Sequence, residues 1–343
     1  MTTPRAGHLL EDVCGYIIRP ERANYELSDL GPPIFRMSDN EVIQYKRTDL
    51  VLENMRSLKI QCSWFNVNKR MPAPGPCVIY LHGNCGSRYD SLELMHLLSD
   101  GFSLFTYDAC GSGKSDGEYV SLGFYERQDL ATVVEYLQST KLVTAIGLWG
   151  RSMGAVTSIM YAAKDKSIKA VIGDSPFSSL RRLVSDLVEM HGSWLPEMVT
   201  EAVVKKVRKQ IAKTAGFDID DLDAMKYAEL CEVPSFLFHG EDDDFVRPHH
   251  SVTVSDHYLG SCIHRVVKGG HNSFRGTDVH SVALPFLQLY LIEKPLAELQ
   301  RSKTMSVPNS GLERGRTSVV ESSVESLSKS KKEDREEIPF KHT

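Results

Sequence analysis

Short apolar runs typical of β-strands alternate with runs of helical periodicity along most of this chain, and no other feature constrains its fold as strongly. The strand-like runs include CVIYLHG, FSLFTYD, VTAIGLWG, IKAVIGD and PSFLFHG. Between the second and third of them, Leu130, Val133, Val134 and Leu137 recur on one face of a helix. Strands joined by crossover helices pair in parallel. The alternation therefore predicts an α/β fold, with a mostly parallel central sheet and helices on both faces.

The pattern changes in three places, which predict the domain organisation. Residues 1–40 precede the first clear strand and form an N-terminal extension, and the main domain spans residues 41–298. Within it, residues 177–232 show helical periodicity without strands, which predicts a small helical cap over the strand ends. Residues 299–343 are rich in Ser, Lys, Arg and Glu, and we expect a disordered tail that could bind a protein partner.

Charge and cysteine content exclude several classes of protein. The formal net charge of -5 gives no basic field for nucleic acid. No apolar run reaches the roughly 18 residues that a membrane-spanning helix needs, and the first residues lack the pattern of a secretory signal. The seven cysteines are odd in number and form no CxxC pair. We therefore expect reduced thiols in a cytoplasmic protein, with no metal site.

A single serine lies between two glycines where a predicted strand gives way to a helix. The run Gly150-Arg151-Ser152-Met153-Gly154 follows AIGLW and leads into a helical pattern. Such a sharp turn crowds the backbone, and glycines relieve the crowding because they lack side chains. We predict Ser152 as a nucleophile exposed above the sheet, with the Met153 N–H aimed at a developing oxyanion. Because a five-residue match also arises by chance, other parts of the chain must support it.

A nucleophilic serine needs a base and an acid that orients the base. Of the twelve histidines, His271 fits best, because it follows the last predicted strand and two glycines let its loop reach Ser152. The acid is expected after PSFLFHG, where residues 242–244 are three consecutive aspartates. Chemistry alone does not choose among the three. Asp174, at the end of another predicted strand, is the alternative acid.

The loop after an earlier strand supplies the remaining parts of the predicted site. YLHGNCGS contains glycines that let the backbone approach a substrate closely. Asn84 is the candidate for the second oxyanion N–H, with Cys85 as the next choice. Gly83, Cys85 and Arg151 are the candidates for contact with the substrate. Cys85 has no dedicated base in this interpretation, so we treat it as a wall residue.

Five motifs, taken together and in this order, make the chain resemble the α/β-hydrolase superfamily: YLHGNCG, YDACGSGKSDG, LWGRSMGA, HGEDDDFVRPHHS and GGHNS. It is most similar to the serine aminopeptidase-like (S33-type) and dienelactone hydrolase-like group, and to uncharacterised eukaryotic α/β-hydrolases. The resemblance covers about residues 11–295. It implies the α/β-hydrolase fold with a helical cap, and a triad in the chain order serine, aspartate, histidine.

The resemblance also assigns single residues. A Gly-x-x-Asp-x-x-Val pattern follows the corresponding strand in this group, and it fits Gly240, Asp243 and Val246, which makes Asp243 the acid. The oxyanion loop of the group matches His82, Gly83 and Asn84. Many relatives carry histidine or tyrosine at the position of Arg151, whose charge either binds an anionic part of the substrate or packs beside the loop.

These residues predict a serine hydrolase that needs no cofactor and cleaves an ester, thioester or amide bond in a small-molecule, acyl or peptide substrate. The alternative is a non-catalytic ligand-binding or scaffold protein on the same fold. The apolar cap helices weakly favour a lipid or an acyl-protein thioester. The basic residues at 205–213 are candidates for contact with an anionic membrane surface. Such a run is more often a solvated helix face.

Overall fold

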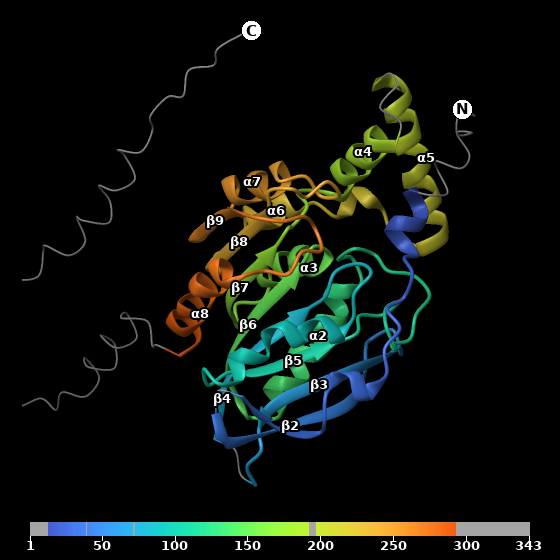
Figure 1. Ribbon diagram of the computed structural model, residues 1–343. Helices are drawn as coiled ribbons and strands as arrows, with labels where there is room; N and C mark the ends of the chain where they lie inside the picture. Colours follow the sequence, from blue (N-terminus) through green and yellow to red (C-terminus); the bar gives the residue numbers. More distant parts are fainter. Residues whose placement is uncertain (1–12, 39, 71–72, 192–196, 293–343) are drawn as a thin grey trace, which may run out of the picture. The chain divides into compact units, whose positions relative to one another are not determined.

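A computed structural model of the protein describes residues 13–38, 40–70, 73–191 and 197–292. The predicted tail at 299–343 lies outside these residues. The described chain is built on a nine-stranded sheet with the order β1-β2-β3-β5-β4-β6-β7-β8-β9 (Figure 1). The strands are β1 (Ile34–Met37), β2 (Asn40–Glu53), β3 (Lys59–Val67), β4 (Gly75–Leu81), β5 (Ser103–Tyr107), β6 (Val143–Arg151), β7 (Ile168–Asp174), β8 (Ser235–Gly240) and β9 (Cys262–Val267).

The sheet is antiparallel at one edge and parallel elsewhere. β1, β2 and β3 pair antiparallel, and β3 pairs antiparallel with β5. From β5 onward every neighbouring pair is parallel. The predicted mostly parallel sheet is therefore confirmed. Because parallel strands end at the same edge, the loops after β4, β6, β8 and β9 come together there.

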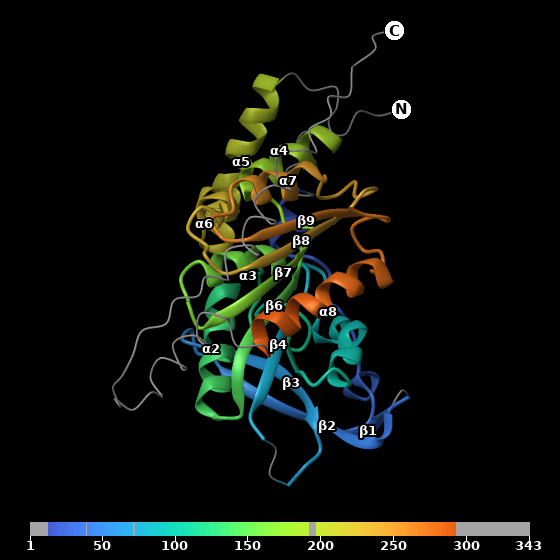
Figure 2. The same ribbon diagram turned by 90° about the vertical axis from the view of Figure 1, so that its left-hand side faces the viewer.

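Helices cover both faces of the sheet, as the alternation predicts. Figure 2 shows α2 and α3 on one side of the strands and α8 on the other. The helical segments are η1 (Leu27–Leu30), η2 (Arg88–Leu98), α2 (Glu126–Ser139), α3 (Met153–Ala162), α4 (Leu180–His191), α5 (Glu197–Ala215), η3 (Ile219–Asp221), α6 (Ala224–Ala228), α7 (His249–Asp256) and α8 (Thr277–Leu291). The buried apolar side chains form two clusters, one containing α2 and α3 and the other containing η2 and α8.

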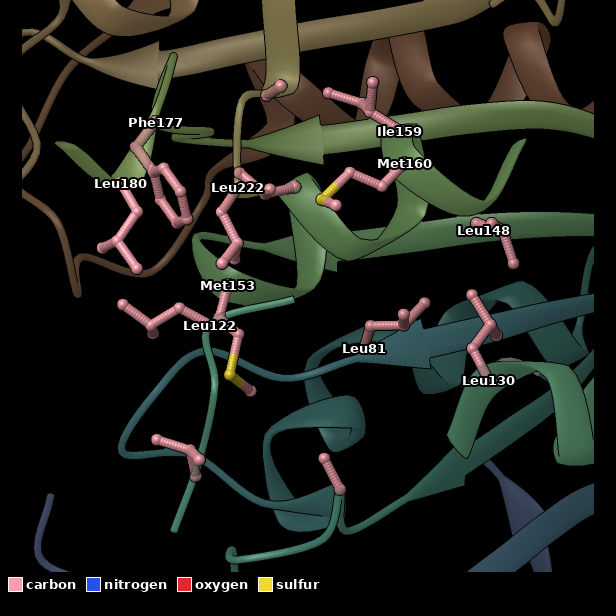
Figure 3. Packing of buried hydrophobic residues seen from close by; sticks show 14 of the residues in the cluster. Leu81, Leu122, Leu130, Leu148, Met153, Ile159, Met160, Phe177, Leu180 and Leu222 are labelled. Atoms are coloured by element: carbon pink, nitrogen blue, oxygen red, sulfur yellow. The ribbon is translucent and has the colours of Figure 1, made fainter. Parts of the chain in front are cut away.

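The chain between β7 and β8 is helical and contains α4, α5, η3 and α6. Its inner side chains belong to the same apolar cluster as the helix that follows the predicted nucleophile. Figure 3 shows Phe177, Leu180 and Leu222 in one group with Met153 and Leu122. α5 ends before Gly216, whose φ of 76° suits a helix stop. The insertion is thus packed onto the core beside the nucleophile turn.

Three helical segments have distinctive geometry. Segment η2 is a 3-10 helix. α2 starts at Glu126, whose side chain accepts hydrogen bonds from the N–H and the hydroxyl of Ser121, while Ser121 Oγ accepts one from the Tyr125 N–H. α8 begins at Thr277 and contains Pro285.

Candidate active site

Ser152 occupies a strained turn between β6 and α3. Its φ of 50° and ψ of -109° lie outside the regions that side-chain-bearing residues normally adopt. The strain is confined to this one residue, because Arg151 ends the strand and Met153 begins the helix. This backbone conformation is the sharp strand-to-helix turn that lifts a serine hydroxyl above a sheet.

The two neighbouring glycines are required by backbone contacts. A Cβ atom added to Gly150 would lie 2.2 Å from the carbonyl oxygen of Gly154. A Cβ atom added to Gly154 would lie 2.1 Å from the carbonyl oxygen of Leu81 on β4. Both distances are far below van der Waals contact, and both partners are backbone atoms that cannot rotate away. The tight turn from β6 into α3 therefore depends on glycine at position 150, and the close approach of α3 to β4 depends on glycine at position 154.

His271 lies between the serine and an aspartate. Its Nε2 atom is 3.1 Å from Ser152 Oγ, and its Nδ1 atom is 2.7 Å from Asp243 Oδ2. Since an ionised carboxylate only accepts hydrogen bonds, the neutral imidazole carries its proton on Nδ1. The lone pair on Nε2 is then free to accept the hydroxyl proton of Ser152. The structure thus brings the three predicted triad residues together, from loops after β6, β8 and β9.

Asp243 differs from its acidic neighbours in burial and in hydrogen bonding. It is buried, whereas Asp242 and Asp244 are exposed. Its Oδ1 atom accepts hydrogen bonds from the backbone N–H groups of Phe245 at 3.1 Å and Val246 at 2.8 Å. These contacts fix the carboxylate in the turn after β8, with Oδ2 directed at the imidazole.

A second histidine supports the same carboxylate, and sequence reasoning missed it. His239 is fully buried, and its Nε2 atom lies 3.1 Å from Asp243 Oδ2 and 2.6 Å from the carbonyl oxygen of Val246. Burial raises the pKa of Asp243, but hydrogen bonds with His239 and His271 outweigh it and hold that pKa well below its usual range. The aspartate therefore stays ionised. The four-residue spacing of His239 and Asp243 was the one feature of the sequence that could have indicated their contact.

Asp174, the alternative acid, is occupied elsewhere. Its carboxylate accepts hydrogen bonds from Arg151 Nε at 2.9 Å and from two nitrogens of Arg275, each at 2.9 Å. Its backbone oxygen accepts a hydrogen bond of 2.7 Å from the Ser152 N–H. The geometry therefore favours Asp243 as the partner of the imidazole. Arg275, four residues after His271, was not singled out by sequence reasoning, because nothing local indicates its pairing with β7.

Arg151 lies in the pocket wall with both of its charged contacts inside the protein. Besides Asp174, its guanidinium pairs with Glu93 at 3.2 Å, and 15% of its side chain is exposed. Two carboxylates therefore compensate its charge. This arrangement matches the packing alternative better than the anion-binding alternative.

The two candidate oxyanion donors flank the serine. Met153 is the first residue of α3, so its N–H has no partner within the helix. Gly83 lies against Ser152, because a Cβ atom built on it would be 3.9 Å from the serine Cβ. The next residue, Asn84, is held by a hydrogen bond of 2.6 Å from its side chain to the carbonyl oxygen of Tyr16. Residues 13–18, which are helical, thus help to fix the loop after β4.

A pocket of about 690 Å³ opens beside Ser152. Its lining consists of Tyr16, Gly83, Asn84, Cys85, Gly86, Asp90, Arg151, Ser152, Asp244, Phe245, His271 and Asn272. The predicted substrate contacts Gly83, Cys85 and Arg151 are all among them. None of the described residues of α4 or α5 lines this pocket, so the suggestion that the cap helices favour a lipid has no support here. The wall is instead a mixture of loop backbone, two carboxylates and two aromatic rings.

Comparison with known proteins agrees with this architecture. The family model described as "alpha/beta hydrolase fold" matches residues 76–225. The esterase Pf2001 of Pyrococcus furiosus superposes with a TM-score of 0.60 at 21% identity, over 80% of this chain and 98% of that one. The chain has the α/β-hydrolase fold, and residues 76–225 match the family model of that fold.

Two curated relatives match over part of their length. The uncharacterized protein YqkD of Bacillus subtilis is 31% identical over 49% of this chain and 55% of its own. The lysophosphatidylserine lipase ABHD12 of Danio rerio is 27% identical over 53% of this chain and 47% of its own. The chain thus spans about half the length of these relatives. In the part of the chain that the structure describes, no helix combines the length and hydropathy needed to cross a bilayer.

Proposed function

We propose that the protein is a serine hydrolase that cleaves a carboxylic ester, thioester or amide bond through Ser152, His271 and Asp243. The observation that carries the proposal is the continuous hydrogen-bonded chain from Ser152 Oγ through His271 to Asp243, with distances of 3.1 and 2.7 Å. The strained turn at Ser152 supports the same role. The esterase and lipase names of similar proteins are consistent with it.

The geometry supports the following reaction. Ser152 Oγ attacks the acyl carbon while His271 Nε2 takes the hydroxyl proton, and the charge on the former carbonyl oxygen is stabilised by the N–H groups of Met153 and Asn84. The leaving group then departs with the proton from Nε2, which leaves an acyl-enzyme. Water repeats the sequence in reverse: His271 takes its proton, the acyl carbon is attacked, and Ser152 recovers its proton as the carboxylic acid is released. Asp243 stabilises the imidazolium throughout.

Among the three bond types, we favour esters, because a structure similar to this one is that of an esterase. The pocket beside Ser152 is bounded by loops, and its wall carries the carboxylates of Asp90 and Asp244. Such a wall disfavours anionic substrates, because the positive charge of Arg151 is already compensated. A peptidase activity of the S33 type remains part of the wider proposal.

A fluorophosphonate probe tests the proposal directly, since it reacts with activated serine nucleophiles. Wild type is expected to gain one covalent adduct by intact-mass measurement, and Ser152→Ala none. Cys85→Ser is the matched control, because it removes the exposed pocket thiol but leaves the triad intact. Equal labelling of Ser152→Ala and wild type would overturn the proposal. No labelling of any form, with no turnover of nitrophenyl esters of any chain length, would favour the ligand-binding alternative.

The location and partners are also proposals. All seven cysteines are free thiols, which supports the cytoplasm as the location. Contact with an anionic membrane surface would use α5, on which Lys206, Lys209 and Lys213 are exposed. Lys205 is exposed as well but forms an ion pair of 3.8 Å with Glu201. Arg208 on the same helix is instead paired with Asp218 and is not available for this purpose.

A further inference from the structure

A cluster of potential metal ligands joins two helices outside the triad. Asp186 lies on α4, in the insertion after β7, whereas His249 and His250 are the first two residues of α7. The three side chains meet, with one ligand atom from each within 4.8 Å of the others. Figures 1 and 2 both show α4 and α7 at the same end of the sheet. The triad uses none of the three residues.

Two of the three ligand–ligand distances in the cluster match those of a tetrahedral metal ion, and the third is within 4.8 Å. Asp186 Oδ2 lies 3.3 Å from His249 Nε2 and 3.2 Å from His250 Nε2. With metal–ligand bonds of roughly 2.0 to 2.1 Å, two ligand atoms of a tetrahedral zinc site are about 3.3 Å apart. The two imidazole rings are stacked, with centroids 4.3 Å apart, so they must turn toward each other's ligand atoms for one small ion to contact the carboxylate oxygen and both nitrogens.

Buried polar atoms in the cluster lack hydrogen-bond partners. Asp186 is 3% exposed and His250 is 0% exposed. Neither carboxylate oxygen of Asp186 nor the Nε2 atom of His250 makes a well-aligned hydrogen bond to any described residue. Arg182 forms an ion pair of 3.0 Å with Asp186 Oδ1 from the solvent side, and Oδ2 is left directed at the two imidazoles. Buried polar atoms that are not fully hydrogen-bonded are costly, and a metal ion would satisfy Asp186 Oδ2 and the two imidazole nitrogens together.

The surroundings of His250 suit a metal ligand. Its Nδ1 atom lies 2.8 Å from Ser178 Oγ and accepts a hydrogen bond of 3.2 Å from the Ser178 N–H. If the imidazole proton moves to Nδ1, it is donated to Ser178 Oγ, and the Nε2 lone pair faces the cluster. Histidine ligands commonly donate their second nitrogen to such an oxygen. This change of tautomer releases no proton.

We propose that Asp186, His249 and His250 bind one Zn²⁺ ion, and that the ion fastens α4 to the start of α7. Two imidazole nitrogens and one carboxylate oxygen form a donor set that zinc favours, and water supplies the fourth ligand. His249 is exposed, so the ion has a route from solvent. The cysteine pattern predicts no metal site. That pattern gives no information on this site, because none of its ligands is a cysteine. Its role is structural and independent of the proposed hydrolase activity.

Direct zinc binding tests the proposal on the full-length chain, prepared without a histidine tag. After removal of metals with a chelator, equilibrium dialysis against Zn²⁺ is expected to give one bound ion per chain. His249→Ala removes an exposed ligand, so it should still fold and bind Zn²⁺ at least tenfold more weakly. His257→Ala is the control, because this histidine is also exposed and lies directly after α7. It should bind Zn²⁺ as wild type does.

Two further readouts separate this site from adventitious binding and from the triad. Zn²⁺ should raise the unfolding temperature of wild type and His257→Ala but not that of His249→Ala. Co²⁺ should give the visible absorption of a tetrahedral complex, which His249→Ala loses. The same results are expected in Ser152→Ala, so failure of the hydrolase proposal leaves them unchanged. Absence of a bound equivalent, or equal binding by wild type and His249→Ala, overturns the zinc site.

Discussion

Arg275 donates two hydrogen bonds of 2.9 Å to the carboxylate of Asp174, and both side chains are buried. Arg275 belongs to the loop that carries His271, and the backbone oxygen of Asp174 accepts a hydrogen bond from the N–H of Ser152. One aspartate at the end of β7 therefore connects the histidine loop with the nucleophile turn. The proposed base and nucleophile keep their separation through this link as well as through their own hydrogen bond.

We predict that Arg275→Met reduces both stability and activity. The change removes the buried ion pair between Arg275 and Asp174, and among the described residues only Arg151 remains as a cation beside Asp174. Loss of one partner of a buried pair costs about 3 kcal/mol of the free energy of unfolding. Because the histidine loop loses its anchor, kcat for an ester substrate should fall while KM changes little. Urea unfolding and steady-state kinetics measure the two effects. Arg265→Met, on the exposed surface of β9, is the control and should alter neither. Equal stability of the two variants would contradict the anchoring role.

We predict that Asp243→Asn lowers kcat by about 10⁴-fold, the size of effect seen when the acid of a serine protease triad is replaced in this way. The amide keeps the shape of the side chain but offers an N–H group to His271 and so favours the wrong tautomer. The measurement is the hydrolysis rate of a nitrophenyl ester that wild type accepts. Asp242→Asn changes the preceding, exposed carboxyl group and should retain nearly full activity. A similar loss in both variants would show that Asp243 has no special role.

The pH dependence of stability should also report on Asp243. Its pKa is lowered in the folded protein, because hydrogen bonds with His239 and His271 outweigh the effect of burial. Above its unfolded value of about 3.9, the ionised group therefore stabilises the folded state. As the pH falls below that value toward the folded pKa, the unfolded chain binds the proton first and this stabilisation is lost.

Asp243→Asn removes the titrating group and hence this loss. Urea unfolding at neutral pH and near pH 3 should show a smaller decrease in the free energy of unfolding for the variant than for wild type. The comparison isolates one carboxyl group, because all other acidic residues are common to both proteins. An identical decrease in the two proteins would mean that Asp243 has an ordinary pKa in the folded state.

The sequence predicted those parts of the molecule that depend on local patterns. The parallel strands follow from short apolar runs, and the turn at Ser152 follows from the two glycines that its crowded backbone requires. The position of His271 beside Ser152 was predictable because His271 follows the last strand. Asp243 was not separable from its neighbours by chemistry, since burial distinguishes the three aspartates and burial depends on how the loop folds.

Features that depend on distant pairings were not predictable from one sequence. Arg275 and Asp174 are 101 residues apart, and either could equally have been a surface charge. The contact of Asn84 with the Tyr16 carbonyl oxygen spans 68 residues and ties the first helical segment to the pocket. The residue at which α2 starts also depends on a side-chain contact that the sequence does not reveal. The side chain of Glu126 bonds back to Ser121, so the chain turns before α2 begins.

The fourth prediction concerns the close contact between α3 and β4. Gly154→Ala would put a Cβ atom 2.1 Å from the carbonyl oxygen of Leu81, so the helix or the strand must move. Overpacking of this kind costs about 1 to 3 kcal/mol, and more where the backbone resists. The movement also displaces Ser152, which immediately precedes the helix. We therefore expect both a lower free energy of unfolding and weaker labelling by a fluorophosphonate.

Gly15→Ala is the matched control, because its added Cβ atom meets no atom within 4 Å and its residue is helical. Alanine is favoured over glycine in a helix by up to about 1 kcal/mol, so this variant should be as stable as wild type or slightly more stable. Chemical denaturation of the two variants beside wild type separates steric conflict from any general effect of adding a methyl group. If Gly154→Ala matched Gly15→Ala in stability and labelling, the tight contact with Leu81 could not be what holds Ser152 in its strained conformation.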